Sequence, residues 1–206
     1  GDVSIAAPVL GIKVLIVPAF SPLFVATEPS SRVWIAAGIA VVGIALVQAR
    51  DDSIDRSRVW AAVGFALLAA VSMTLFDLLI QRWAGTWGTG YLLPLAFGFS
   101  AVFSLVFLPL ADPISRLKEN QVLRPLTVGS LLMAVQAIGM TVTLGLFGDA
   151  TRVNIVYSLR GLWGVLLTWV LAHKLNERET IPSHRVMSIR LGGAALIACS
   201  VILAVT

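Results

Sequence analysis

Lys13 and Arg160 are the two residues whose type and position most strongly indicate chemistry. Each lies inside an apolar stretch long enough to cross a bilayer, and each stands twelve residues after a Gly-Asp pair, Gly1-Asp2 and Gly148-Asp149 respectively. Twelve helical residues advance the chain by about 18 Å, close to the middle of a hydrocarbon core about 30 Å thick. A Lys or Arg at that depth costs about 2.5 to 3.5 kcal/mol on insertion scales, so each cation needs a partner or water.

Two such cations suit an acidic ligand. Arginine offers a planar fork of donors and lysine a mobile point charge, and together they can hold a carboxylate or a phosphate. Asn154 and Tyr157 follow helical steps beside Arg160, and Gln136 lies near the centre of another apolar stretch. We therefore predict a substrate-binding group formed by Lys13, Arg160, Tyr157, Asn154 and Gln136.

Asp77 is a carboxylate well inside an apolar stretch, and the sequence leaves its role open. It could carry a coupling proton, or it could be an acid near the membrane interface that Gln81 or Arg82 satisfies at helical spacing. The cations also have a structural interpretation. In that interpretation Lys13 or Arg160 pairs with Asp77, or with carbonyls that nearby prolines free, and lines no binding site.

The elements that must position these residues are transmembrane helices. Hydrophobic residues make up 58% of the chain, charged residues 13%, and the mean hydropathy is +0.91. Because lipid satisfies no backbone polar groups, apolar stretches of this length must be helical. We predict an all-α polytopic membrane protein with seven spans, near residues 3–26, 33–49, 59–81, 91–111, 126–147, 153–172 and 188–205.

The chain also contains an internal repeat. Residues 1–46 align with 148–202, which pairs Lys13 with Arg160 and Ala36–Gly43 with Gly192–Cys199. Five predicted crossings separate the first span from the sixth, so the two copies enter the membrane from opposite faces. This is the pattern of an inverted-topology repeat, which is typical of transporters that work by alternating access.

The repeated segments resemble the EamA-type transporters of the drug/metabolite transporter superfamily. The resemblance is carried by GDVSIAAPVLGIKVLIV with WIAAGIAVVGIALV, and by GDATRVNIVYSLRGLWGVLL with RLGGAALIACSVILAV. It implies ten helices in two five-helix halves, so that residues 1–50 are the last two helices of the first half and residues 51–206 the second half. Three helices would then precede Gly1; a chain that began there would need another assembly, such as a homodimer.

These observations predict a secondary transporter that moves a small anionic or zwitterionic metabolite. The resemblance extends to sugar-phosphate translocators, which place basic residues on such helices, and it implies a bacterial cytoplasmic (inner) membrane. Expected partners are the substrate, the bilayer and a coupling proton at Asp77. The alternatives are a non-transporting membrane component, either a partner subunit or an inert truncation, and a flippase for a lipid-linked substrate. No enzyme activity, cofactor, metal or nucleic-acid partner is expected.

Overall fold

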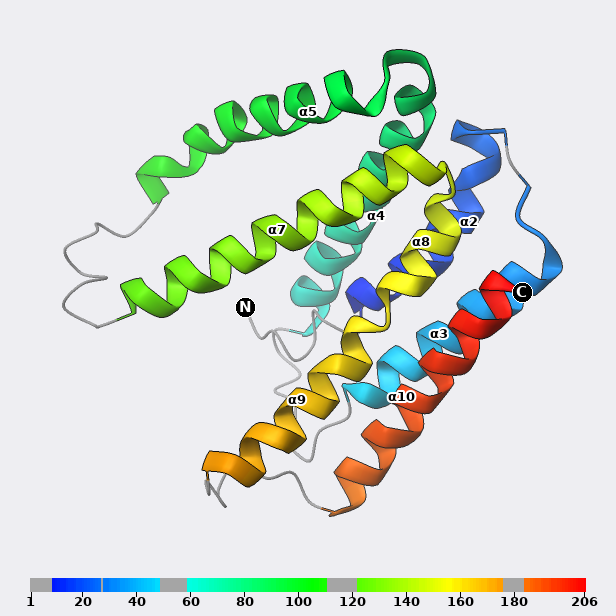
Figure 1. The fold of residues 1–206 in the computed structure, drawn as a ribbon, viewed down its shortest axis with the longest axis vertical. Helices are drawn as coiled ribbons and strands as arrows, with labels where there is room; N and C mark the ends of the chain where they lie inside the picture. The colour runs from blue at the N-terminus through cyan, green and yellow to red at the C-terminus, as the bar shows by residue number, and fades with distance from the viewer. Residues whose placement is uncertain (1–8, 27, 49–58, 111–121, 176–183) are drawn as a thin grey trace. The chain divides into compact units, whose positions relative to one another are not determined.

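The computed structural model describes residues 9–26, 28–48, 59–110, 122–175 and 184–206, and within these ranges all regular structure is helical. Figure 1 shows the helices in chain order. Their bounds are α2 Lys13–Phe24, α3 Ser31–Val47, α4 Val59–Trp87, α5 Thr89–Ser104, the 3-10 helix η2 Leu105–Leu110, α7 Leu123–Phe147, α8 Ala150–Tyr157, α9 Arg160–Leu175 and α10 His184–Val205.

Four helical stretches of the described chain are long and apolar enough to cross a membrane: Ala62–Trp87, Thr89–Leu110, Leu123–Phe147 and Arg185–Val205. Val9–Phe24 and Ser31–Val47 are apolar helices of shorter length. The predicted span 153–172 is divided between α8 and α9. The fold class is therefore all-α with the apolar helices of an integral membrane protein, and seven complete crossings stay a prediction.

The second Gly-Asp pair ends one helix and begins the next. Gly148 follows α7 in the left-handed region with φ +62°, where glycine has no Cβ to clash, and its N–H donates to the Leu144 carbonyl. The Asp149 carboxylate then accepts the Arg152 backbone N–H at 2.9 Å and caps α8. The equivalent Gly1-Asp2 pair lies outside the described residues.

The chain divides into two compact units, Gly1–Leu79 with Asp149–Thr206, and Ile80–Gly148. In the first unit, α3 and α10 pack antiparallel, since Val33 and Ala204 share one buried cluster at opposite ends of the two helices. The backbones approach closely at Gly43, where an added Cβ would lie 2.8 Å from the Gly193 carbonyl oxygen. The glycines of α3 and α10 thus form a close helix–helix contact.

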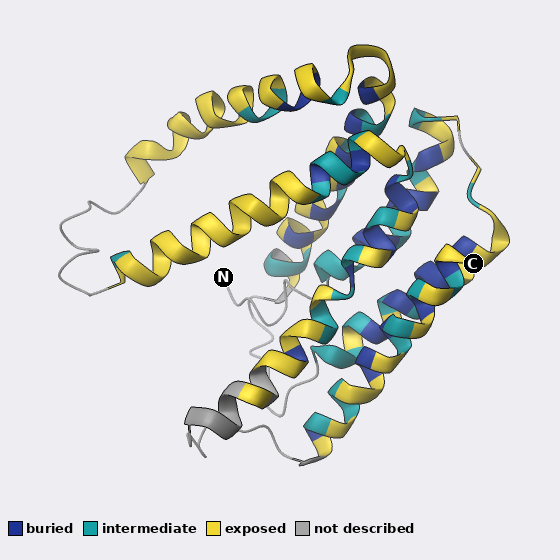
Figure 2. Ribbon diagram, in the orientation of Figure 1, coloured by how far each residue is buried: buried dark blue, intermediate teal, exposed yellow. Residues whose placement is uncertain are grey.

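The second unit contains the end of α4, α5, η2 and α7. The Gln81 side-chain amide donates to the Gly148 carbonyl at 2.6 Å, which ties the end of α4 to the end of α7. An added Cβ on Gly145 would lie 2.7 Å from the Thr89 side chain, so α7 and α5 touch at this point. Elsewhere α5 and α7 are largely exposed, and only 11% of the apolar stretch of each is buried (Figure 2).

The two units do not coincide with the predicted repeat halves, 1–50 and 51–206. Helices α2 and α3 group with α8, α9 and α10 across that boundary. The division into repeat halves stays a prediction.

Candidate functional site

A buried ion pair joins α2 to α4. The Lys13 Nζ lies 2.6 Å from the Asp77 Oδ2, and the two side chains are only 10% and 6% exposed. These residues are 64 positions apart in the sequence, so the pair is a tertiary contact between two apolar helices. Of the interpretations that the sequence leaves open for Lys13, the structure shows pairing with Asp77.

Asn154 of α8 completes the group, and we call Lys13, Asp77 and Asn154 the buried triad. The Asn154 Nδ2 donates to the Asp77 Oδ2 at 2.7 Å and to the Ala150 carbonyl at 2.9 Å. One carboxylate oxygen therefore accepts from an ammonium and an amide on two different helices. Because all three residues belong to the first compact unit, the triad is an internal feature of that unit.

Asp77 lies farther from the end of its helix than the predicted span implied. The predicted span ended near residue 81, which would leave Asp77 close to the interface. The observed span continues to Trp87, ten residues beyond Asp77, or about 15 Å along the helix axis. Asp77 is 4% exposed, and Thr74, one turn earlier on the same face, is fully buried with its hydroxyl bonded to the Ala70 carbonyl.

Both cations stand directly after a matching turn in their helices. The Ile12 N–H donates to the Val9 carbonyl at 3.0 Å, and the Leu159 N–H donates to the Val156 carbonyl at 3.0 Å. These are 3-10 bonds from residue i to i−3, tighter than α-helical bonds. Adding 147, the offset of the sequence repeat, to 9 and 12 gives 156 and 159, so the two turns are equivalent positions. Regular helix resumes at Lys13 in one copy and at Arg160 in the other.

Ser158 lies at the second turn. The Ser158 hydroxyl bonds to the Ile155 carbonyl at 2.6 Å, and the Ser158 N–H is shared between the Asn154 and Ile155 carbonyls. A serine hydroxyl that bonds back to its own helix competes with the backbone ladder and bends the helix. The predicted span 153–172 is divided between α8 and α9 at this serine. In the first copy, the residue equivalent to Ser158 is Gly11, which sits tightly against the Ile44 side chain of α3.

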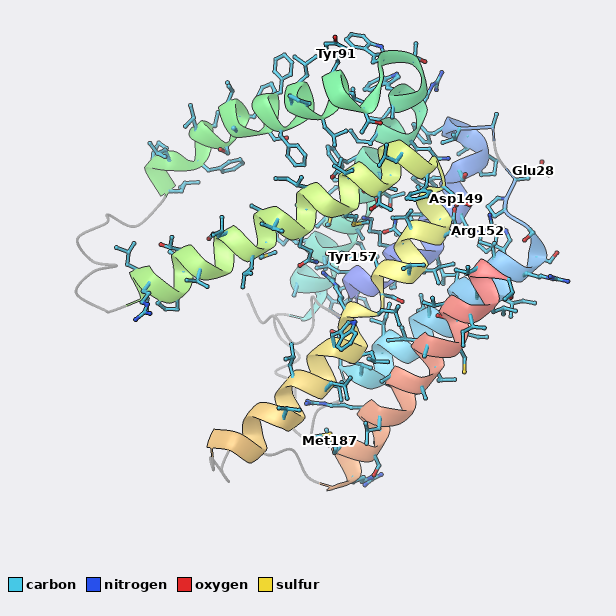
Figure 3. All side chains as sticks on the ribbon, in the orientation of Figure 1. Glu28, Tyr91, Asp149, Arg152, Tyr157 and Met187 are labelled. Carbon is cyan, nitrogen blue, oxygen red and sulfur yellow. The ribbon has the colours of Figure 1, made fainter. Side chains whose placement is uncertain are left out.

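Arg160 has a different environment from Lys13. Arg160 is exposed. Its Nη1 donates to the Tyr157 hydroxyl at 3.0 Å, and its guanidinium carbon lies 4.7 Å from the centroid of the Tyr157 ring. Figure 3 shows Tyr157 at the junction of α8 and α9. The structure thus brings Arg160 and Tyr157 together, and separately Lys13, Asp77 and Asn154. The predicted convergence of Lys13 with Arg160 stays a prediction.

Gln136 lies on α7 in the second unit and is exposed. Pro18, predicted to free a carbonyl near Lys13, is buried within α2 one turn beyond Val14. Its predicted counterpart Pro8 lies outside the described residues.

Chemically, the triad offers one cation and one anion in contact inside an apolar bundle, and Arg160 offers a second cation in the equivalent place of the other copy. The sequence pattern singled out every member of the triad but did not join them as a group. It missed Ser158, whose signal was a hydroxyl residue two positions before Arg160 in an otherwise apolar stretch.

Among the described residues, no group of three or more His, Cys, Asp or Glu is placed to hold a metal ion. Comparisons of the chain with models of protein families, with curated proteins and with solved structures give no match.

Proposed function

We propose that the chain belongs to a secondary transporter of the EamA type, which moves a small anionic or zwitterionic metabolite across the membrane by alternating access. The observation that carries this proposal is the buried triad, in which charged and polar side chains from α2, α4 and α8 meet inside apolar helices. Ionisable residues inside membrane segments are costly, and they commonly mark substrate or ion pathways.

The inverted repeat is supported by two features of the first unit. The 3-10 turns at Ile12 and Leu159 occur at positions that the sequence alignment makes equivalent. In addition, α2 runs opposite to α8 and α9, and α3 runs opposite to α10, as Figure 1 shows. An inverted-topology repeat requires that equivalent helices of the two copies run in opposite directions. Transporters with such repeats bind their substrates beside interrupted helices.

In this proposal Lys13 and Arg160 bind the acidic group of the substrate, and the turns before them are the points at which each helix can bend. Arg160 is exposed and can accept a ligand without losing a buried partner. Lys13 is held by Asp77, so substrate binding at Lys13 has to open an existing ion pair. Rocking of one repeat against the other would then expose the site to each side of the membrane in turn.

The test is uptake by proteoliposomes that contain the full-length protein, with a panel of labelled carboxylate, phosphate and amino-acid metabolites. We expect saturable uptake of at least one of them, lost in Arg160→Met and kept in Arg185→Met. Arg185 is a matched control because it is an exposed arginine near the start of α10, outside the triad. Uptake that is unchanged in Arg160→Met would remove the assigned role of Arg160.

One observation favours a second candidate, a non-transporting membrane component. The charge on Lys13 is already balanced by Asp77, and a pair of this kind can serve structure alone. In that case the reconstituted full-length protein would carry no metabolite of the panel above the rate of empty liposomes.

A further inference from the structure

Exposed tryptophan side chains stand at both ends of α4. Trp60 is the second residue of the helix and is 84% exposed, and Trp87 is its last residue and is 59% exposed. Trp83, one turn before Trp87, is exposed as well. An indole ring has an apolar body and one N–H donor, so it is most stable where apolar and aqueous surroundings meet. The two ends of α4 therefore fit the two interfaces of a lipid bilayer.

The distance between these tryptophans matches the thickness of a bilayer. Trp87 follows Trp60 by 27 positions (87 − 60). In an α-helix these positions advance the chain by about 40 Å. A bilayer is about 40 to 45 Å thick when its headgroup layers are included, and its hydrocarbon core is about 30 Å thick. With little tilt, α4 can place one indole ring in each headgroup layer.

The exposed surface of α4 between its two ends is apolar. The large exposed side chains there are Phe65, Leu67, Leu68, Met73 and Phe76. The sequence has no charged residue from Trp60 to Phe76. Asp77 is buried, so Arg82, directly before Trp83, is the first exposed charge along the helix. The apolar surface thus ends where an exposed cation and the tryptophans begin.

The start of α5 adds another amphipathic ring at the same corner of the chain. Gly88 joins α4 to α5 with a φ of +76°, a conformation that glycine adopts without strain. Tyr91, in the first turn of α5, is exposed (Figure 3). We call Arg82, Trp83, Trp87 and Tyr91 the aromatic corner. It combines one cation with three rings that each carry a polar group.

We infer that the aromatic corner binds phospholipid headgroups at one face of the membrane, and that Trp60 lies in the headgroup layer of the other face. Arg82 pairs with a lipid phosphate, because the guanidinium fork and the negative phosphate are complementary in charge and geometry. The rings lie at the boundary between the headgroups and the acyl chains. This inference makes α4 a complete crossing, and it does not depend on the proposed transport function.

The inference also gives the depth of the buried triad. Asp77 is 17 positions after Trp60 (77 − 60) and 10 before Trp87 (87 − 77). It therefore lies about 5 Å along the helix axis from the midpoint between the two tryptophans. The triad is then close to the centre of the bilayer, on the side of the aromatic corner.

The test measures the depth of single tryptophans in the full-length protein, labelled with fluorinated tryptophan and placed in lipid bicelles. Trp60→Phe, Trp87→Phe and Trp163→Phe each remove one fluorine resonance and so assign it. Two paramagnetic lipids are compared, one with gadolinium on the headgroup and one with a nitroxide at the end of an acyl chain. We expect the headgroup label to broaden the Trp60 and Trp87 resonances several-fold more than the acyl-chain label does.

Trp163 is the matched control, because it is an exposed tryptophan near the middle of the predicted span 153–172, and it should show the opposite preference. Arg82→Leu should lower the ratio of headgroup to acyl-chain broadening at Trp87 and leave it unchanged at Trp60. An unchanged ratio at Trp87 would remove the phosphate contact. Stronger broadening of Trp60 or Trp87 by the acyl-chain label would overturn the inference. Absence of broadening by either lipid would overturn it too, because protein would then cover the rings.

Discussion

Removing one member of the buried pair should destabilise the protein far more than removing the equivalent cation of the other copy. The perturbation is Lys13→Met, which keeps the length of the side chain and deletes its charge. It leaves the Asp77 carboxylate buried with Asn154 as a remaining donor. The matched control is Arg160→Met, because the proposed repeat pairs the two positions while the structure leaves Arg160 exposed.

The magnitude follows from burial. Breaking a buried ion pair by deleting one partner costs about 3 to 5 kcal/mol, because the other charge stays desolvated. The side-chain exposures of 10% and 6% place this pair in that class. The expected loss corresponds to a change of about 150-fold to about 4,000-fold in the unfolding equilibrium. For Arg160→Met we expect a change within about 1 kcal/mol, the scale of an exposed cation–π contact.

The assay is equilibrium unfolding of the full-length protein in lipid bicelles, with both single variants, Asp77→Leu and the double variant Lys13→Met with Asp77→Leu. The double variant should recover most of the stability that Lys13→Met loses, since replacing a buried pair by apolar residues is often neutral or stabilising. Equal stability of Lys13→Met and Arg160→Met, or simple additivity in the double variant, would refute the reasoning.

Three further changes probe the surroundings of the triad by the same unfolding assay. Asn154→Leu removes a hydrogen-bond donor to Asp77 and should lower the free energy of unfolding by about 1 to 3 kcal/mol. A smaller loss would show that the hydrogen bond from the Asn154 side chain to the carboxylate is weak. Gly43→Ala should cost about 1 to 3 kcal/mol of stability, because the new Cβ would meet the backbone of α10. Gly38→Ala is the control and should cost nothing, since an added Cβ there has no atom within 4 Å. Equal effects of the two changes would contradict the close packing of α3 and α10. Tyr157→Ala should cost about 0.5 to 1 kcal/mol, and a much larger loss would mean that the tyrosine supports more than its stack with the guanidinium.

The sequence predicted the elements of the fold better than their ends. We predicted helices because lipid leaves no partner for the backbone polar groups of long apolar stretches, and all regular structure of the described residues is helical. The end of α4 was placed too early, because Gln81 and Arg82 suggested a polar boundary. In the structure the Gln81 amide bonds to the Gly148 carbonyl, and the helix continues to Trp87. The sequence alone could not show that the Gly148 carbonyl is the partner of Gln81, because the two residues are 67 positions apart.

The members of the candidate site were predicted from the sequence, and pairing of Lys13 or Arg160 with Asp77 was one of the interpretations left open. The sequence alignment predicts that Lys13 and Arg160 are equivalent positions of two copies, and a 3-10 bond precedes each of them. The sequence did not determine which cation would meet Asp77, since both have the same spacing from their Gly-Asp pairs. The difference arises from packing: one cation is enclosed beside α4, and the other lies exposed on the Tyr157 ring.

The role of the buried pair in transport is tested most directly by uptake into proteoliposomes containing the double variant Lys13→Met with Asp77→Leu. This variant should remain folded, because no buried charge is left without a partner. We predict that its uptake falls to the level of empty liposomes, while the wild-type protein transports. Uptake at the wild-type rate by the folded double variant would contradict the claim that the ion pair is the site of transport.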